Sequence, residues 1–220
     1  MYKSLIVSCQ ALENEPLHGS VVMAKMATAA KEGGAKAIRS NSASDVAAIK
    51  KIIGIPVIGL IKREYGDSEV FITPTLKEVK ELLEVNPEVI ALDATIRKRP
   101  NAERLEDLVR YIHEHSNTLV MGDIATVGDA EYAIGCGVDM VSTTLSGYTA
   151  DSPKIEGPDF ELVKQLCKNT NLPVIAEGRI TTPEQARRML ELGAWSIVVG
   201  GAITRPQLIT KGFMEGIKGV

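Results

Sequence analysis

Short runs of β-branched and apolar residues alternate with helix-like segments along the whole chain, and this alternation constrains the fold most. Eight runs are predicted to be strands, at residues 5–9, 37–39, 57–61, 89–93, 119–122, 140–142, 174–176 and 196–199. Segments with helical periodicity lie between them, among them 21–31, 76–85, 105–115, 125–136, 160–167 and 183–192. Strands that alternate with helices predict βα units and a parallel sheet.

Two observations favour a closed TIM (β/α)8 barrel over an open doubly wound sheet. Residues 54–58 in the third unit resemble residues 171–175 in the seventh, and an offset of four units suggests two related half-barrels. The last two strands also end in glycines, and TIM barrels commonly bind phosphate with the loops after strands 7 and 8. No Pro/Ser-rich linker divides the 220 residues, so we expect one domain over residues 1–220.

The composition gives no sign of a nucleic-acid or membrane partner. The net charge is only −3 at pH 7, and the apolar stretches are far too short to span a membrane. The first residues lead directly into a strand and do not resemble a signal peptide. Cys9, Cys136 and Cys167 lack CxxC or zinc-binding spacing, so we expect buried, reduced thiols in a cytoplasmic protein.

Polar side chains stand at or just past the ends of most predicted strands. In a barrel of this type, chemistry collects where the carboxyl ends of the strands meet. The candidates are Gln10, Arg39, Lys62, Asp93, Asp123, Thr143 or Thr144, and Glu177. The eighth strand ends instead in Gly200-Gly201.

Lys62 and Glu177 follow the third and seventh strands, which lie diametrically opposite in an eight-membered ring. A substrate carbon between them is open to proton removal on one face and proton return on the other, as inversion of a stereocentre requires. The ordinary pKa of a lysine amine is ~10.4, and it must be lowered, by burial or by a cation such as Arg39 or Arg63, before Lys62 can act as a base. The ordinary pKa of a glutamate carboxyl is ~4.3, and it must be raised before Glu177 can act as an acid. The alternatives are an anion contact for Lys62 and an ion pair with Arg179 for Glu177.

The last two predicted strands end in a pattern typical of phosphate binding. One run ends in Gly178-Arg179, and the other passes through Gly200-Gly201 into a helical segment with Arg205 at its start. Glycines let backbone N–H groups approach an anion closely, and a helix N-terminus adds partial positive charge. These two strand ends therefore predict a phosphate site.

Metal ions and nicotinamide cofactors have no support in the sequence. His18 lies in the first loop, and His113 and His115 lie in a polar helical segment. The strand ends lack the clustered His and carboxylate ligands of a metal site, and no glycine-rich dinucleotide fingerprint is present. Two long loops, 63–75 and 145–158, follow the third and sixth strands, and we expect them to act as lids.

With these residues in place, the whole chain resembles the N-acetylmannosamine-6-phosphate 2-epimerases, also called N-acylglucosamine-6-phosphate 2-epimerases. The strings that carry the resemblance are LIVSCQ (5–10), GLIKR (59–63), IALDAT (90–95), STTLSGYT (142–149), AEGR (176–179) and VGGAITR (199–205). The first and fourth strings together are specific, whereas Val-Gly-Gly alone occurs in many phosphate-binding barrels.

The resemblance implies a TIM barrel that interconverts N-acetylmannosamine 6-phosphate and N-acetylglucosamine 6-phosphate in sialic-acid breakdown, without metal or organic cofactor, as a homodimer. It implies that Lys62 and Glu177 are catalytic, that Gln10, Arg39 and Asp123 contact the substrate, and that Gly178, Gly200, Gly201 and Arg205 hold the phosphate. One departure concerns Arg39: the family often has alanine next, whereas Ser40 and Asn41 follow here, and Asn41 is a candidate for a left-handed turn.

Several alternatives remain open on the sequence alone. Lys62 and Glu177 share the proton transfer at C2, or Lys62 performs both transfers while Glu177 opens the sugar ring. A Schiff-base lyase that uses Lys62 as its nucleophile is the nearest rival enzyme. A non-catalytic phosphosugar-binding barrel subunit is the rival from another class, and it has no need for the opposed amine and carboxyl.

Overall fold

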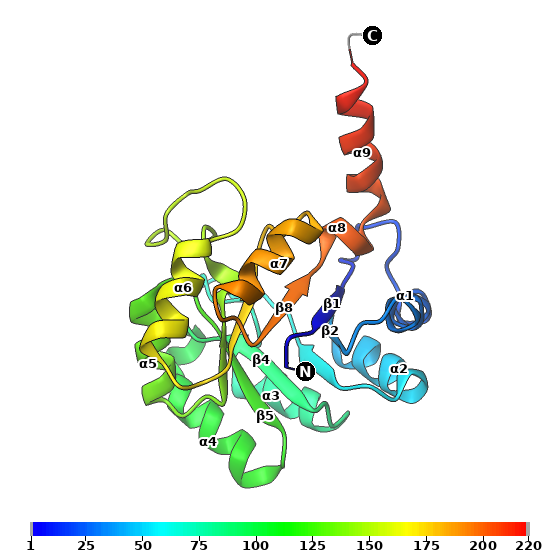
Figure 1. Ribbon diagram of the computed structural model, residues 1–220. Coiled ribbons are helices and arrows are strands. Elements are labelled where there is room, and N and C mark those ends of the chain that lie inside the picture. Colours follow the sequence, from blue (N-terminus) through cyan, green and yellow to red (C-terminus); the bar gives the residue numbers. More distant parts are fainter. Residues whose placement is uncertain (1, 219–220) are drawn as a thin grey trace.

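A computed structural model, which describes residues 2–218, shows eight parallel strands closed into a barrel in the order of the sequence (Figure 1). β8 pairs with β1 through Leu5 opposite Ile197, which closes the ring. The strands are β1 Leu5–Cys9, β2 Ala37–Asn41, β3 Val57–Leu60, β4 Val89–Asp93, β5 Leu119–Asp123, β6 Met140–Ser142, β7 Val174–Glu177 and β8 Ser196–Val199. The predicted TIM barrel is therefore confirmed, with every predicted strand present.

Helices surround this barrel and connect consecutive strands (Figure 1). They are α1 Ser20–Glu32, α2 Ala43–Ile53, α3 Leu76–Leu83, α4 Leu105–His115, α5 Val127–Gly135, α6 Phe160–Asn169 and α7 Pro183–Glu191, followed by α8 Gly201–Thr204 and α9 Pro206–Gly216. Two short 3-10 turns, Pro100–Ala102 and Thr143–Leu145, lie before α4 and after β6. No helix in the described range 2–218 is both long and apolar enough to cross a membrane.

Helix ends follow local chemistry in the sequence. α3, α5 and α7 each begin with a capping box. The hydroxyl of Thr75, Thr126 or Thr182 accepts a hydrogen bond from a backbone N–H of the first turn, and a side-chain oxygen of that turn accepts one from the threonine backbone N–H. Near the other ends of α5 and α7, Gly137 and Gly193 take φ values of 90° and 107°, the left-handed region that turns the chain toward the next strand. These devices fix where each strand starts and so where it ends.

Strand parity decides which side chains enter the barrel. Ile6, Ile58, Met121, Ile175 and Val198 belong to a buried cluster in the barrel interior, whereas their strand neighbours pack toward the helices. Residues two or four positions further along each strand also point their side chains into the barrel, which we call inward parity. The residues with this parity at the carboxyl ends are Ser8, Gln10, Arg39, Lys62, Asp123, Glu177 and Gly200.

The long loop 63–75 packs into the barrel and does not stand over its mouth as a free lid. Ile72 pairs with Lys62 in an antiparallel bridge, and the Thr73 N–H donates to the Ile61 carbonyl at 2.7 Å. Val70, Ile72 and Thr73 are at most 2% exposed. The loop is thus a short hairpin that supports the end of β3.

Glycine is required in β5 by close packing. A Cβ atom at Gly122 would lie 2.9 Å from the Cβ of Ala94 and 3.4 Å from a methyl of Val138. We expect Gly122→Ala to lower the free energy of unfolding by about 1–3 kcal/mol because the neighbouring strand must shift. Urea denaturation measures the change. Gly66→Ala is the matched control, since nothing lies within 4 Å of its added methyl, and equal stability of the two variants would contradict this packing argument.

Candidate active site

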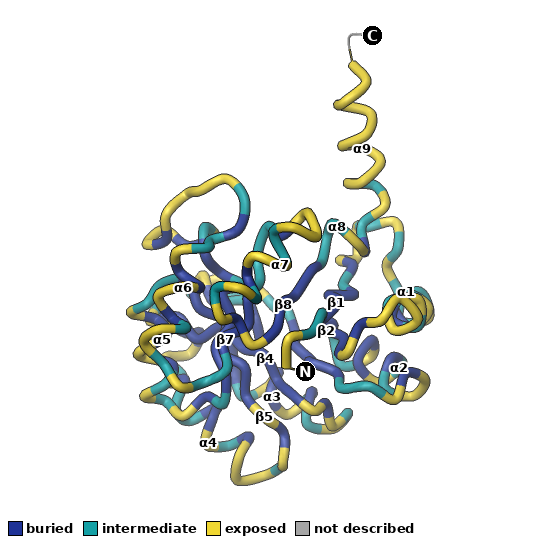
Figure 2. Tube along the Cα trace, viewed as in Figure 1, coloured by how far each residue is buried: buried dark blue, intermediate teal, exposed yellow. Residues whose placement is uncertain are grey.

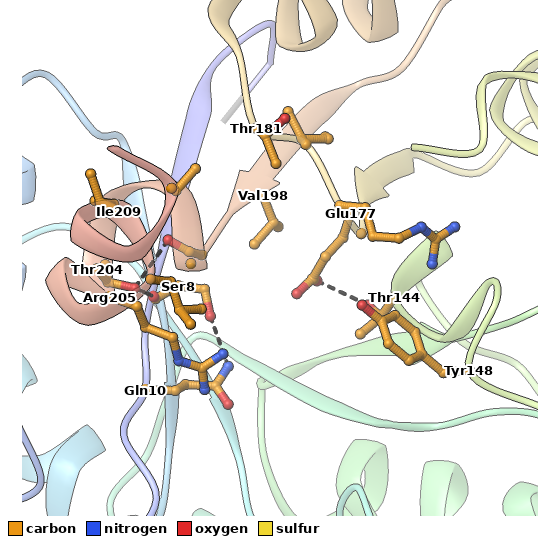
Figure 3. A pocket seen from close by; sticks show the side chains of 18 of the residues that line it. Ser8, Gln10, Thr144, Tyr148, Glu177, Thr181, Val198, Thr204, Arg205 and Ile209 are labelled. Carbon is orange, nitrogen blue, oxygen red and sulfur yellow. Dashed lines mark hydrogen bonds between the residues drawn. The ribbon is translucent and has the colours of Figure 1, made fainter. Parts of the chain in front are cut away.

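A cavity of about 690 Å³ opens at the carboxyl ends of the strands. Figure 3 shows two groups of side chains across it, with Ser8, Gln10 and Arg205 on one side and Glu177 and Thr144 on the other. Lys62 also lines the cavity. The structure therefore brings the predicted amine, carboxyl and glycine-rich strand ends into one space.

Lys62 is held by its neighbours on both sides. Its backbone N–H donates to Oδ1 of Asn41 at 2.8 Å, and its bridge to Ile72 ties it to the loop 63–75. Asn41 is the last residue of β2, and the left-handed residue is Ser42 with φ 73°. The expected turn at Asn41 was therefore wrong by one residue, because Asn41 stays in the strand to bind Lys62.

The pKa of Lys62 lies below its ordinary value. Burial is the main cause, and the positive charge of Arg39 adds to it. Arg63, the other cation expected to act here, points elsewhere and pairs with Glu78 and Glu81. A lowered pKa makes the neutral amine of Lys62 more accessible near neutral pH.

A buried ion cluster lies beneath the cavity. Both NH2 groups of the Arg39 guanidinium bind Asp123, at 3.0 Å to Oδ1 and 2.5 Å to Oδ2. The same guanidinium lies 3.0 Å from Oε2 of Glu177. Arg39 and Asp123 are 1% and 0% exposed, so neither lines the cavity, and their predicted contact with a substrate stays a prediction.

Glu177 stands at the end of β7, where Thr143 exchanges hydrogen bonds with its backbone N–H and carbonyl at 3.0 and 2.8 Å. Its Oε2 lies 2.9 Å from the Thr144 hydroxyl. Burial raises the pKa of Glu177 above its ordinary value, the cation of Arg39 opposes this rise, and the carboxylate of Asp123 adds to it. A neutral form of this carboxyl is thereby favoured.

Arg179 is not the partner of Glu177, so that alternative was wrong. Its Nε donates to the Gly157 carbonyl at 2.6 Å, and a terminal nitrogen donates to the Ser146 carbonyl. Its guanidinium carbon also lies 5.4 Å from the ring centre of Tyr148. Arg179 thus fastens the loop 145–158 to the end of β7, because these carbonyls lie within its reach.

Gly178, Gly200, Gly201 and Arg205 also line the cavity. As at the start of any helix, the first N–H groups of α8 have no acceptor within the helix. The guanidinium of Arg205 pairs with Glu15 from the loop after β1, with Nε 2.8 Å from Oε1. No local pattern predicts this pairing, because Glu15 lies in an irregular loop.

Gln10 offers a further group to a ligand. Its Nε2 donates to Oγ of Ser8 at 2.9 Å, while its buried Oε1 has no hydrogen-bond partner within residues 2–218. Ser8 was missed, although its place two residues before Gln10 gives it the same inward parity.

Asp93, another strand-end candidate, is fully buried and pairs with Arg97 away from the cavity. The described residues contain no group of three His, Cys, Asp or Glu side chains arranged to hold a metal ion.

Fold and site together define a (β/α)8-barrel enzyme in which a lysine, a glutamate, glycine-rich strand ends and an arginine line one cavity at the carboxyl ends of the strands. Residues 23–219 match a family model described as "Putative N-acetylmannosamine-6-phosphate epimerase", and the chain belongs to this family.

Two curated relatives are named "Putative N-acetylmannosamine-6-phosphate 2-epimerase". The protein from Clostridium perfringens is 56% identical over 98% of this chain and 97% of its own length, and that from Clostridioides difficile is 56% identical over 97% and 96%. A solved structure described as the N-acetylmannosamine-6-phosphate 2-epimerase from Clostridium perfringens superposes with a TM-score of 0.95 at 55% identity. It covers 97% of this chain and 93% of its own chain.

The buried cluster generates a stability prediction. Arg39→Met leaves two buried carboxyls without their cation, so we expect the free energy of unfolding to fall by about 3–5 kcal/mol at pH 7. Burial already raises the pKa of Glu177, and without the opposing charge of Arg39 this pKa lies further above its value in the unfolded chain. The loss is therefore largest at neutral pH and shrinks as the pH falls and Glu177 becomes protonated.

Urea denaturation at pH 7 and pH 5 measures both effects. Arg187→Met is the matched control, since Arg187 is 83% exposed in its pair with Glu191, and a change below about 0.5 kcal/mol is expected there. A loss for Arg39→Met that is independent of pH would contradict the charge argument.

Proposed function

We propose that the protein interconverts N-acetylmannosamine 6-phosphate and N-acetylglucosamine 6-phosphate by removing and returning the proton at C2. The observation that carries this proposal is the placement of Lys62 and Glu177, which come from opposite strands of the ring and line one cavity. Family membership supports the same substrate pair.

The proposed chemistry begins with opening of the sugar ring, because the C2 hydrogen is not acidic until C1 becomes an aldehyde. One of Lys62 and Glu177 then removes the C2 proton, which leaves an enediolate-like intermediate. The other returns a proton to C2 on the opposite face. The lowered pKa of Lys62 and the raised pKa of Glu177 bring both groups closer to the operating pH, where acid–base catalysis is most efficient.

The phosphate binds at the far end of the cavity in this proposal. The backbone at Gly178, Gly200 and Gly201 approaches the anion, and Arg205 contributes a cation whose orientation Glu15 holds. Binding energy at this remote group positions C2 between Lys62 and Glu177.

The middle of the sugar lies against Gln10, whose free Oε1 accepts from a hydroxyl or from the amide N–H of the N-acetyl group. Arg39 and Asp123 contribute by setting the charge and the position of Glu177.

Deuterium exchange tests the proposal. Wild-type protein in D2O should place deuterium at C2 of the product sugar, as read by NMR. Lys62→Arg keeps the positive charge but removes the titratable amine, so we expect kcat to fall by at least about 100-fold. Lys77→Arg on the exposed face of α3 is the control and should retain wild-type turnover.

Three outcomes would count against this assignment. Product sugar without deuterium would contradict exchange with solvent. A substrate adduct trapped by borohydride at Lys62 would favour the Schiff-base lyase. Tight phosphosugar binding without turnover would favour the non-catalytic barrel. Exchange without epimerisation in Glu177→Gln is expected if the two groups share the proton transfer.

We further propose that the protein is a homodimer held together by α9. This helix projects from the barrel, and none of its residues is buried (Figures 1 and 2). Its exposed apolar side chains include Phe213 at 74% and Met214 at 55%. An isolated helix of this length is only marginally stable in water, so α9 needs a surface to pack against.

A second copy of the chain fits this need. Each of the first seven strands is followed by a helix of eight residues or more, whereas after β8 the barrel receives only the four-residue α8 before α9 turns away. Reciprocal packing, in which α9 of each copy covers the other copy, satisfies both helices with one twofold interface.

The three free cysteines support a cytoplasmic location as well.

Sedimentation equilibrium tests the dimer. We expect a dimer for the wild-type chain and a monomer for Phe213→Glu combined with Met214→Glu, because two charges on the apolar face of α9 would be buried in the interface. Ile52→Glu is the control, since Ile52 is equally exposed on α2 at 54% and should leave the dimer intact. A monomeric wild-type chain would overturn this proposal.

A further inference from the structure

Thr144 lies between the two carboxyls of the buried cluster and contacts both. Its Oγ1 is 2.7 Å from Oδ1 of Asp123 and 2.9 Å from Oε2 of Glu177. The hydroxyl of Ser142 lies 2.9 Å from the same Oγ1. These contacts are short enough that each needs a proton between its two oxygens.

A count of protons shows what this geometry requires. A threonine hydroxyl has one proton to donate and two lone pairs to accept with. If Asp123 and Glu177 were both ionised, Thr144 could donate to only one of them, and its other short contact would join two unprotonated oxygens. If one carboxyl is protonated, that carboxyl donates to Thr144, Thr144 donates to the other, and every contact is satisfied. The cluster therefore holds one proton on its two carboxyls.

The geometry of the Arg39 contacts favours Glu177 as the site of this proton. Arg39 binds both oxygens of Asp123 and only one oxygen of Glu177. Bidentate binding by a guanidinium is the stronger interaction. Two hydroxyls lie near Oε2 of Glu177: Thr144 has its shorter contact with Asp123, at 2.7 Å against 2.9 Å, and Ser142 is 3.4 Å from Oε2 but 2.9 Å from Oγ1 of Thr144. In the arrangement with the shortest contacts, Thr144 donates to Asp123 and Ser142 donates to Thr144.

The other groups around Glu177 fit this assignment. Burial raises its pKa, and the charged groups that face it are Arg39 from β2, Lys62 after β3 and Asp123 from β5. Arg179, two residues further along, directs its charge to backbone carbonyls. With Lys62 as a neutral amine, Arg39 is the one cation beside the two carboxyls, and a single proton on Glu177 then balances the charges of this cluster.

We propose that Thr144 is a positioning residue that holds Glu177 as a neutral acid and passes its proton to Asp123 during turnover. The inference rests on the proposed function. Figure 3 shows one oxygen of Glu177 directed at Thr144 and the other directed into the cavity. The two oxygens of Glu177 therefore have separate tasks.

The proton transfer balances in three linked steps. Oε1 of Glu177 accepts a proton from the substrate, and Oε2 gives its own proton to Oγ1 of Thr144. Thr144 gives its original proton to Oδ1 of Asp123. The substrate loses one proton, Asp123 gains one, and Glu177 and Thr144 each still carry one. The reverse sequence returns a proton to the substrate.

Two substitutions at Thr144 separate this role from simple packing. Thr144→Val keeps the shape of the side chain but breaks the link, so we expect kcat to fall about 10- to 100-fold while KM changes by less than about threefold. Thr144→Ser keeps the hydroxyl and should recover most of the lost rate. An unchanged kcat in Thr144→Val, or a loss seen only in KM, would overturn the proposal even though the wild type epimerises.

Infrared spectroscopy tests the resting proton without turnover. In protein with ¹³C-labelled glutamate, the difference between wild type and Glu177→Gln at neutral pH should contain the carbonyl band of a protonated carboxylic acid. Thr144→Val should move this band to higher frequency because the acid loses its acceptor. A difference with carboxylate bands only would refute the neutral Glu177. This result is independent of epimerisation, so failure of the proposed function remains distinguishable.

Discussion

A single guanidinium inside the barrel faces two carboxyls, and the site depends on this imbalance. Moving a charge into a protein interior costs several kcal/mol unless it is paired, and one cation pairs fully with only one carboxylate. Arg39 binds both oxygens of Asp123, while burial raises the pKa of Glu177, the charge of Arg39 opposes this rise and the charge of Asp123 adds to it. The same guanidinium repels the ammonium form of Lys62. One buried cation therefore shifts both groups that face the cavity.

The barrel supplies this arrangement through strand parity. Side chains at alternate positions enter the interior, and the last inward position of a strand lies at the carboxyl end, where the mouth opens. Apolar residues such as Ile58 and Ile175 fill the layer below, and Lys62 and Glu177 follow on the same faces of their strands. Position in the ring then determines which groups oppose each other, since β3 and β7 are four strands apart.

Much of this could be predicted from the sequence because it depends on local patterns. Strand runs, helix caps and glycine stops depend on consecutive residues, so all eight strands were found, together with Lys62, Glu177 and the glycines that line the cavity, whereas Ser8 was missed. Contacts between distant segments leave no such pattern. The pairing of Glu15 with Arg205, the bond from Asn41 to Lys62 and the link through Thr144 arise from the closed ring. Arg179 shows the same limit: its neighbour Glu177 was an obvious partner in sequence, but the backbone directs the guanidinium to the loop 145–158.

The position of α9 has a consequence for how the protein responds to dilution. Leu208, Ile209 and Gly212 belong to this helix and also form part of the cavity wall beside Gly201. In the proposed dimer, the helix that packs on a second copy would therefore also shape the space where an anion would bind. Subunit association and ligand affinity would then be thermodynamically linked, and each would change the other by the same free energy. At low protein concentration the affinity for small phosphorylated molecules would fall, and a high concentration of these molecules would favour the dimer.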